Sequence, residues 1–156
     1  MNDRHIHDVV RILKKDLGAE KLPIVTALAE READPFAILI STLLSLRTKD
    51  EVTADATDRL FRLASTPQEM LALPEKEMIK AIYPVGFYRN KARTIHEACR
   101  VLIERFDSRV PDTIEELLTI KGVGRKTANL VIGLGYGKPS ICVDTHVHRI
   151  SNRLGY

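Results

Sequence analysis

Apolar residues recur at helical spacing along most of the chain, and the strict alternation that marks β-strands is nearly absent. Between residues 95 and 106 the apolar positions follow one helical face, formed by Ile95, Ala98, Cys99, Leu102, Ile103 and Phe106. The segment 36–46 is apolar on nearly all sides, and Asp34-Pro35 before it offers an N-cap followed by proline at the first helical position. The pattern therefore predicts an all-α fold with residues 36–46 as its buried central helix.

Proline and glycine mark further helix boundaries. Thr66-Pro67 and Pro111-Asp112 are expected helix starts, while Gly18 and Gly86 are expected stops or turns. Residues 1–30 are predicted to form an amphipathic helix that packs on the main helical domain with the face made by Ile6, Val9, Val10, Leu13 and Leu17.

The composition, 44% hydrophobic and 29% charged, is that of a globular protein and excludes the disordered and fibrous classes. The longest apolar stretch, residues 35–46, carries three hydroxyl side chains and is shorter than the roughly 20 residues that span a bilayer. The N-terminus is polar and mixed in charge, which is unlike a secretory signal or a transit peptide. We therefore expect no membrane interaction and a cytoplasmic, nucleoid-associated location.

The net charge of +3 is modest, but the cations concentrate near the C-terminus. From residue 121 onward Asp144 opposes six cations, which are Lys121, Arg125, Lys126, Lys138, Arg149 and Arg153. Such a distribution fits a phosphate backbone, or else an ordinary solvated face. No metal site is expected, because the two cysteines cannot build a thiolate cluster and His146 and His148, two residues apart, diverge on a helix.

The segment 118–129 carries the strongest chemical signal. A helix is expected to end near Thr119, and a loop with Gly122 and Gly124 leads at once into another helix. Glycines at alternate positions permit positive φ values and close approach of another molecule, and the following helix start presents unpaired N–H groups. With Lys121 and Arg125 beside it, this loop predicts a site for a DNA phosphate, although a plain helix-loop-helix turn is the alternative.

The run IKGVGRKTAN at 120–129, followed by VDTHVHR at 143–149, resembles the hairpin and catalytic-aspartate motifs of the endonuclease III-like helix-hairpin-helix DNA glycosylases. The similarity extends upstream through 43–50 and 86–92 and covers roughly residues 34–156 in matching order. It implies that the hairpin contacts DNA through Lys121, Gly122, Val123, Gly124 and Arg125. It also implies a monovalent cation at the hairpin carbonyls.

By the same resemblance, Lys126 would attack the sugar C1′ of a damaged nucleotide, expel the base and hold the sugar as a Schiff base that undergoes β-elimination. The helix start and the cations Arg125 and Lys121 disfavour another positive charge on this amine. Asp144 would assist deprotonation and stabilise positive charge developing on the sugar. Without the resemblance, Lys126 is a phosphate-binding or surface lysine, and Asp144 is a helix N-cap.

The resemblance also places Arg47 where the family fills the gap left by a rotated-out nucleotide, and Phe87 at the turn that wedges the opposite strand. Endonuclease III commonly has glutamine where this chain has Arg47, and a guanidinium can donate a hydrogen bond to an orphaned base but cannot accept one. The plain alternatives are a solvated helix end for Arg47 and a core position for Phe87.

Together these features imply a bifunctional DNA glycosylase and abasic-site lyase of base-excision repair, acting on oxidised pyrimidines in double-stranded DNA. The implied architecture is a helical domain at 31–138 with a smaller second lobe. Residues 1–30 form the N-terminal segment of this lobe, and residues 139–156 are the start of its C-terminal part. The alternatives are a non-catalytic helix-hairpin-helix module that grips phosphates and a mismatch-specific glycosylase. Lys126 favours the lyase, since mismatch enzymes generally lack that lysine.

Related enzymes continue past this point with further helices and a Cys-rich loop that holds a [4Fe-4S] cluster. This chain has no cofactor of that kind, and the cluster is expected only if the natural protein continues past Tyr156. A shortened form or a cluster-free variant would explain this ending. We favour the shortened form because apolar surface at Val147, Ile150 and Leu154 would otherwise stay uncovered, and we expect weak activity and self-association for it.

Overall fold

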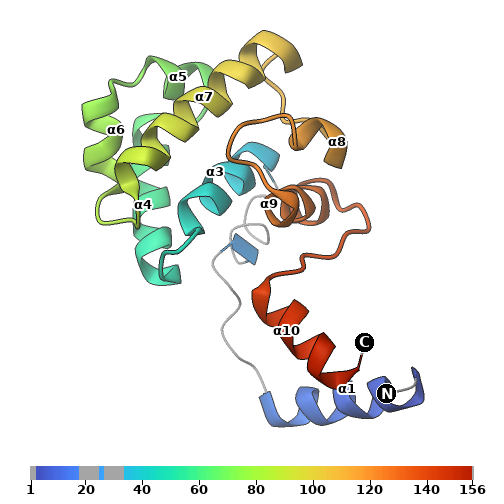
Figure 1. Ribbon diagram of the computed structural model, residues 1–156. Coiled ribbons are helices and arrows are strands. Elements are labelled where there is room, and N and C mark those ends of the chain that lie inside the picture. The colour runs from blue at the N-terminus through green and yellow to red at the C-terminus, as the bar shows by residue number, and fades with distance from the viewer. Residues whose placement is uncertain (1–2, 18–24, 27–33, 156) are drawn as a thin grey trace. The chain divides into compact units, whose positions relative to one another are not determined.

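The computed structural model describes residues 3–17, 25–26 and 34–155, and every regular element in these ranges is a helix (Figure 1). The predicted all-α fold is confirmed. No helix within these ranges is long and apolar enough to cross a membrane. Contacts divide the chain into two compact units, one within residues 23–142 and the other from residues 1–22 together with 143–156.

The larger unit holds most of the helices. In chain order they are α3 (Pro35–Ser45), α4 (Asp50–Leu63), α5 (Pro67–Ala72), α6 (Glu75–Ile82), α7 (Tyr88–Phe106), α8 (Ile114–Leu117), α9 (Arg125–Leu130) and the π-helix η1 (Val131–Gly135). The smaller unit contains α1 (Asp3–Leu17) and α10 (Thr145–Leu154).

Helix α3 is the central element of the larger unit, as predicted. Asp34 caps it by accepting hydrogen bonds from Phe36 N at 3.1 Å and Ala37 N at 3.2 Å, and Pro35 occupies its first turn. All nine residues from 36 to 44 are buried. The helix therefore has no solvent-facing side along this stretch.

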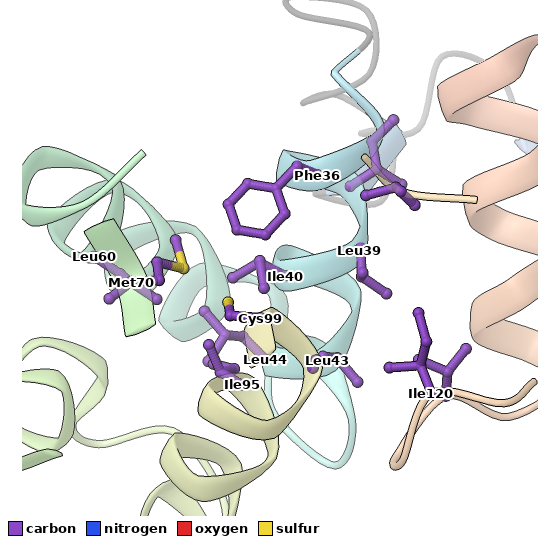
Figure 2. Packing of buried hydrophobic residues seen from close by; sticks show 14 of the residues in the cluster. Phe36, Leu39, Ile40, Leu43, Leu44, Leu60, Met70, Ile95, Cys99 and Ile120 are labelled. Atoms are coloured by element: carbon purple, nitrogen blue, oxygen red, sulfur yellow. The ribbon is translucent and has the colours of Figure 1, made fainter. Parts of the chain in front are cut away.

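Helix α3 packs on two groups of helices at once. It contacts α4 and α7 on one side and α9 and η1 on the other. In Figure 2, Ile40 and Leu44 lie toward Ile95 of α7, whereas Leu39 and Leu43 point toward Ile120 of the hairpin. Each of these fully buried aliphatic side chains stabilises the fold by about 1.5–3 kcal/mol.

Helix α7 buries the face that its apolar spacing predicts. Ile95, Ala98, Cys99 and Leu102 have no exposed surface, and Phe106 is half-buried against the same core. Burial raises the pKa of the Cys99 thiol to about 12, so that this cysteine stays protonated and serves as a small hydrophobic side chain.

Two expected helix starts had different outcomes. Thr66 caps α5 in a full capping box with Glu69, as the Thr-Pro signal predicts. The start expected at Pro111-Asp112 is wrong by two residues, because Thr113 is the N-cap of α8. The Thr113 hydroxyl accepts from Glu116 N and donates to the Glu116 carboxylate at 2.7 Å, and this local exchange fixes the boundary.

The smaller unit keeps much of its apolar surface exposed. Within α1, Val10 and Leu13 are 41% and 48% exposed. In α10 no side chain is buried, and Val147 and Ile150 are 43% and 51% exposed. Residues 1–2, 18–24 and 27–30 of the predicted 1–30 helix, including Gly18, lie outside the described residues.

Candidate nucleic-acid interface and active site

The glycine hairpin between α8 and α9 is held from inside the larger unit. Ile120 and Val123 bury their side chains, and Val123 N donates to Ile120 O at 3.0 Å to close the turn. Lys121, Gly124 and Arg125 are exposed. Val123, predicted to contact DNA, therefore gives its side chain to the core and its N–H to the turn.

The two hairpin glycines play different structural parts. Gly122 has φ +89°, and a Cβ there would lie 2.4 Å from Thr94 Cγ2 of α7. Gly124 has φ −96°, and no atom lies within 4 Å of the position its Cβ would take. Of the two uses of glycine considered, Gly122 shows the positive φ and Gly124 the open surface. Gly122 is required by the fold, whereas Gly124 leaves the surface open for close approach.

These environments predict opposite effects for two alanine variants. Gly122→Ala should lower the free energy of unfolding by about 1–3 kcal/mol, because it strains a left-handed residue against Thr94, whose hydroxyl is bonded to Asn90 O at 3.0 Å. Gly124→Ala should change it by less than about 0.5 kcal/mol. The same Gly124→Ala should weaken duplex DNA binding about tenfold, the loss of one charge-assisted hydrogen bond.

Denaturant unfolding and fluorescence anisotropy with duplex DNA measure the two effects. Affinity of both the wild type and Gly124→Ala should fall with added salt through counterion release. If Gly124→Ala bound DNA as tightly as the wild type, DNA would not approach the chain closely at Gly124. If Gly122→Ala were as stable as the wild type, the contact with Thr94 would not be what requires glycine at that position.

Lys126 lies in the first turn of α9, directly after the hairpin. Its neighbours Thr127 and Ala128 are buried, and this burial fixes the rotation of α9 so that the Lys126 side chain is on the exposed face. Helix α9 continues into η1, and the end of η1 is fixed because the Tyr136 hydroxyl donates to Val110 O and Lys138 Nζ donates to Asp112 O at 2.8 Å. These two bonds tie the end of the continuous helix to residues 110 and 112.

Asp144 is the N-cap of α10, as its sequence position predicts. Its Oδ1 accepts from His146 N at 2.9 Å and from Val147 N at 2.8 Å. This role fixes the carboxylate at the start of the helix. Asp144 belongs to the smaller unit and Lys126 to the larger one.

Arg47 and Phe87 come from different segments, and the structure brings them together. The Arg47 guanidinium carbon lies 5.8 Å from the centroid of the Phe87 ring, within the range of a cation–π contact. The backbone of both residues is in the left-handed helical conformation, with φ of 53° for Arg47 and 57° for Phe87. Phe87 is 61% exposed, which rules out the alternative that it is a core residue.

Comparison with known proteins identifies the family of this chain. The model of the HhH-GPD superfamily of base excision DNA repair proteins matches residues 40–156, which include the hairpin, Lys126 and Asp144. The chain belongs to this superfamily.

The HhH-GPD chain has clear relatives among curated proteins. It is 52% identical over 126 residues to endonuclease III of Thermotoga maritima, covering 81% of this chain and 59% of the relative. It is 40% identical over 123 residues to endonuclease III of Bacillus subtilis, covering 79% of this chain and 56% of the relative. The chain thus spans less than two thirds of the length of these two relatives.

Two solved structures are similar to this chain in fold and sequence. A trapped endonuclease III–DNA covalent intermediate matches with a TM-score of 0.86 and 37% identity, over 99% of this chain and 70% of that one. A thermostable thymine-DNA glycosylase matches with a TM-score of 0.74 and 27% identity, over 83% of this chain and 64% of that one.

The residues of this HhH-GPD chain do not fit an iron–sulfur cluster. Such a cluster is held by four cysteine thiolates, whereas the sequence has two cysteines and Cys99 is enclosed in the core. Among the described residues no group of three His, Cys, Asp or Glu side chains could hold a metal ion.

Sequence reasoning missed one buried cation of this HhH-GPD chain. Lys91 is 8% exposed, and its Nζ donates to Leu44 O, Leu46 O and Thr48 Oγ1. Burial lowers the pKa of Lys91 to about 8. The available signal was its spacing, because Lys91 stands four and seven residues before Ile95 and Ala98, in line with the apolar stripe of α7.

Proposed function

We propose that this HhH-GPD chain acts in base-excision repair as a bifunctional DNA glycosylase and abasic-site lyase with Lys126 as the nucleophile. The observation that carries the proposal is the position of Lys126, exposed in the first turn of α9 and directly after the hairpin. The similarity to a structure described as a trapped endonuclease III–DNA covalent intermediate supports a covalent route. The proposed substrate is an oxidised pyrimidine in double-stranded DNA, by similarity to endonuclease III.

In the proposed reaction, the Lys126 amine attacks C1′ as the bond from C1′ to the base breaks. The base leaves with that electron pair and takes up a proton, and the sugar ring opens to give a Schiff base on the lysine. Removal of a C2′ proton then breaks the C3′–O bond, and water releases the product. The Asp144 carboxylate is proposed to stabilise the positive charge that develops on the sugar.

Binding of the duplex is proposed to use the hairpin. Exposed Lys121 and Arg125 flank Gly124, where the surface is open, and the helix that follows presents N–H groups without partners inside the helix. These contacts fix the position of the DNA backbone without reading its sequence.

Borohydride trapping tests the proposal. With DNA that contains an abasic site, borohydride should reduce the Schiff base and leave a covalent protein–DNA adduct, and intact duplex should give none. Because the adduct accumulates irreversibly, the assay also detects a slow enzyme. Binding of abasic DNA without any adduct would identify a non-catalytic phosphate-gripping module instead.

Arg47 is proposed to enter the space left by the rotated-out nucleotide. Arg47→Ala should then lower the single-turnover rate of base excision about tenfold more than the rate of cleavage at a preformed abasic site, where less unstacking is needed. The ratio of the two rates is the measurement, and Arg62→Ala, an exposed arginine on α4, is the control. Equal losses on the two substrates would assign Arg47 to general phosphate contact.

A further inference from the structure

Lys91 joins the end of α3 to the start of α7. Its ammonium group donates to Leu44 O at 2.6 Å, Leu46 O at 2.6 Å and Thr48 Oγ1 at 3.0 Å. An ammonium has three N–H donors and no acceptor, so these three oxygens satisfy it completely. The two carbonyls belong to the last turn and C-cap of α3, where the helix itself supplies no donors.

Thr48 extends this contact to the turn before α7. Its hydroxyl oxygen accepts from Lys91 Nζ and from Gly86 N at 3.1 Å, and it donates to Leu46 O at 3.3 Å. A Cβ on Gly86 would lie 2.5 Å from Arg47 O, so the two backbones touch with no space for a side chain. Segment 46–48 and residues 86–87 are therefore fastened together.

The fastened segments are those that carry Arg47 and Phe87. Both residues hold the left-handed conformation, which non-glycine residues adopt only where their surroundings determine it. Bonds from Lys91 lie on either side of Arg47, at Leu46 O and at Thr48 Oγ1. The exposed side chains of Arg47 and Phe87 then meet outside this buried joint.

A role limited to capping α3 would use only the two carbonyls. The bond from Lys91 to Thr48, and the bond from Gly86 to the same hydroxyl, extend beyond the helix end to the two segments that carry Arg47 and Phe87. A neutral amide side chain has two N–H donors on one nitrogen, one fewer than this geometry uses.

We propose that Lys91 is a positioning residue for lesion recognition, which holds Arg47 and Phe87 in the conformation that enters the duplex. This inference rests on the proposed glycosylase function. Lys91 itself is buried and acts on DNA through Arg47 and Phe87.

The test compares Lys91→Met with the wild type on two substrates. Met keeps the apolar stem and removes the three donors. The rate of excising a paired damaged base should fall about 10- to 100-fold, the usual effect of a displaced contact group. Cleavage at a preformed abasic site should fall less than about twofold. Lys91→Arg, which keeps the charge and several donors, should recover part of the excision rate.

A double-mutant cycle with Arg47→Ala distinguishes positioning from a general loss of stability, because destabilisation alone would not change the ratio of the two rates. If Lys91 acts through Arg47 and Phe87, then Lys91→Met should change the ratio of the two rates less in the Arg47→Ala background than in the wild type. Cys99→Ala, a buried change on the same face of α7, is the control for general destabilisation and should leave the ratio unchanged. An undiminished effect in the Arg47→Ala background would overturn the proposal.

Hydrogen exchange separates this inference from the proposed function. Without DNA, peptides that cover 45–49 and 84–88 should exchange faster in Lys91→Met, while the core of α7 keeps its protection. Thr48→Val, which removes the shared hydroxyl, should give the same pattern if Lys91→Met does not fold. Unchanged exchange in the variants would show that no such joint exists, whether or not the protein is an enzyme.

Discussion

Replacing Lys126 with glutamine is expected to lower borohydride trapping on abasic DNA by about 10³-fold or more, since an amide nitrogen cannot form a Schiff base. The fold should be unaffected, because the side chain is exposed and glutamine has nearly the helix propensity of lysine. Binding of abasic DNA should fall only by the loss of one cation. The measurement is the yield of covalent adduct at matched protein concentration.

Lys121→Gln is the matched control for this variant. Lys121 is also exposed and lies in the hairpin five residues earlier, so its removal takes away the same charge from the same surface. It should weaken binding and reduce the salt dependence, yet trap normally once the protein is saturated with DNA. Equal loss of trapping in both variants would show that Lys126 contributes charge and not the nucleophilic amine.

Replacing Asp144 with asparagine is expected to lower base excision by about 10²- to 10³-fold, the usual range for removal of a group that stabilises charge developing in the transition state. Asparagine is as good an N-cap as aspartate, so the hydrogen bonds to His146 N and Val147 N can be kept. Stability should therefore fall by less than about 1 kcal/mol, which is the contribution of one charge to the helix dipole. Single-turnover excision and thermal unfolding together measure the two effects.

Asp144→Ala completes the comparison, because it removes the cap as well as the charge. It should unfold about 1 kcal/mol more easily than Asp144→Asn and have a similarly low excision rate. Full activity in Asp144→Asn would leave Asp144 as a structural cap alone.

Local patterns in the sequence predict a helix best where a single signal marks its start or its buried face. The apolar stripe of α7 and the Asp34-Pro35 start of α3 depend on residues close together in the chain, and both are confirmed. The start of α8 was misplaced because Pro111-Asp112 and Thr113 are competing signals two residues apart. The side-chain exchange between Thr113 and Glu116 decides between them.

Features of the candidate site that depend on distant contacts could not be predicted. Gly122 and Gly124 look alike in the sequence, and only the approach of Thr94 from α7 separates them. The bond from Lys91 to Leu44 joins residues 47 positions apart, and no local pattern encodes it. The positions of Arg47 and Phe87 came from family resemblance, whereas their mutual contact required the structure.

The burial of α3 on both flanks has a consequence for cooperativity. Because α4 and α7 pack on one side of this helix and α9 and η1 on the other, neither group can lose its structure while the other keeps a complete core. The larger unit should thus melt in a single two-state transition. A core substitution at either end of it then raises the globally unfolded population of the hairpin and of the Arg47 segment by the same factor, although the two are built from different parts of the chain.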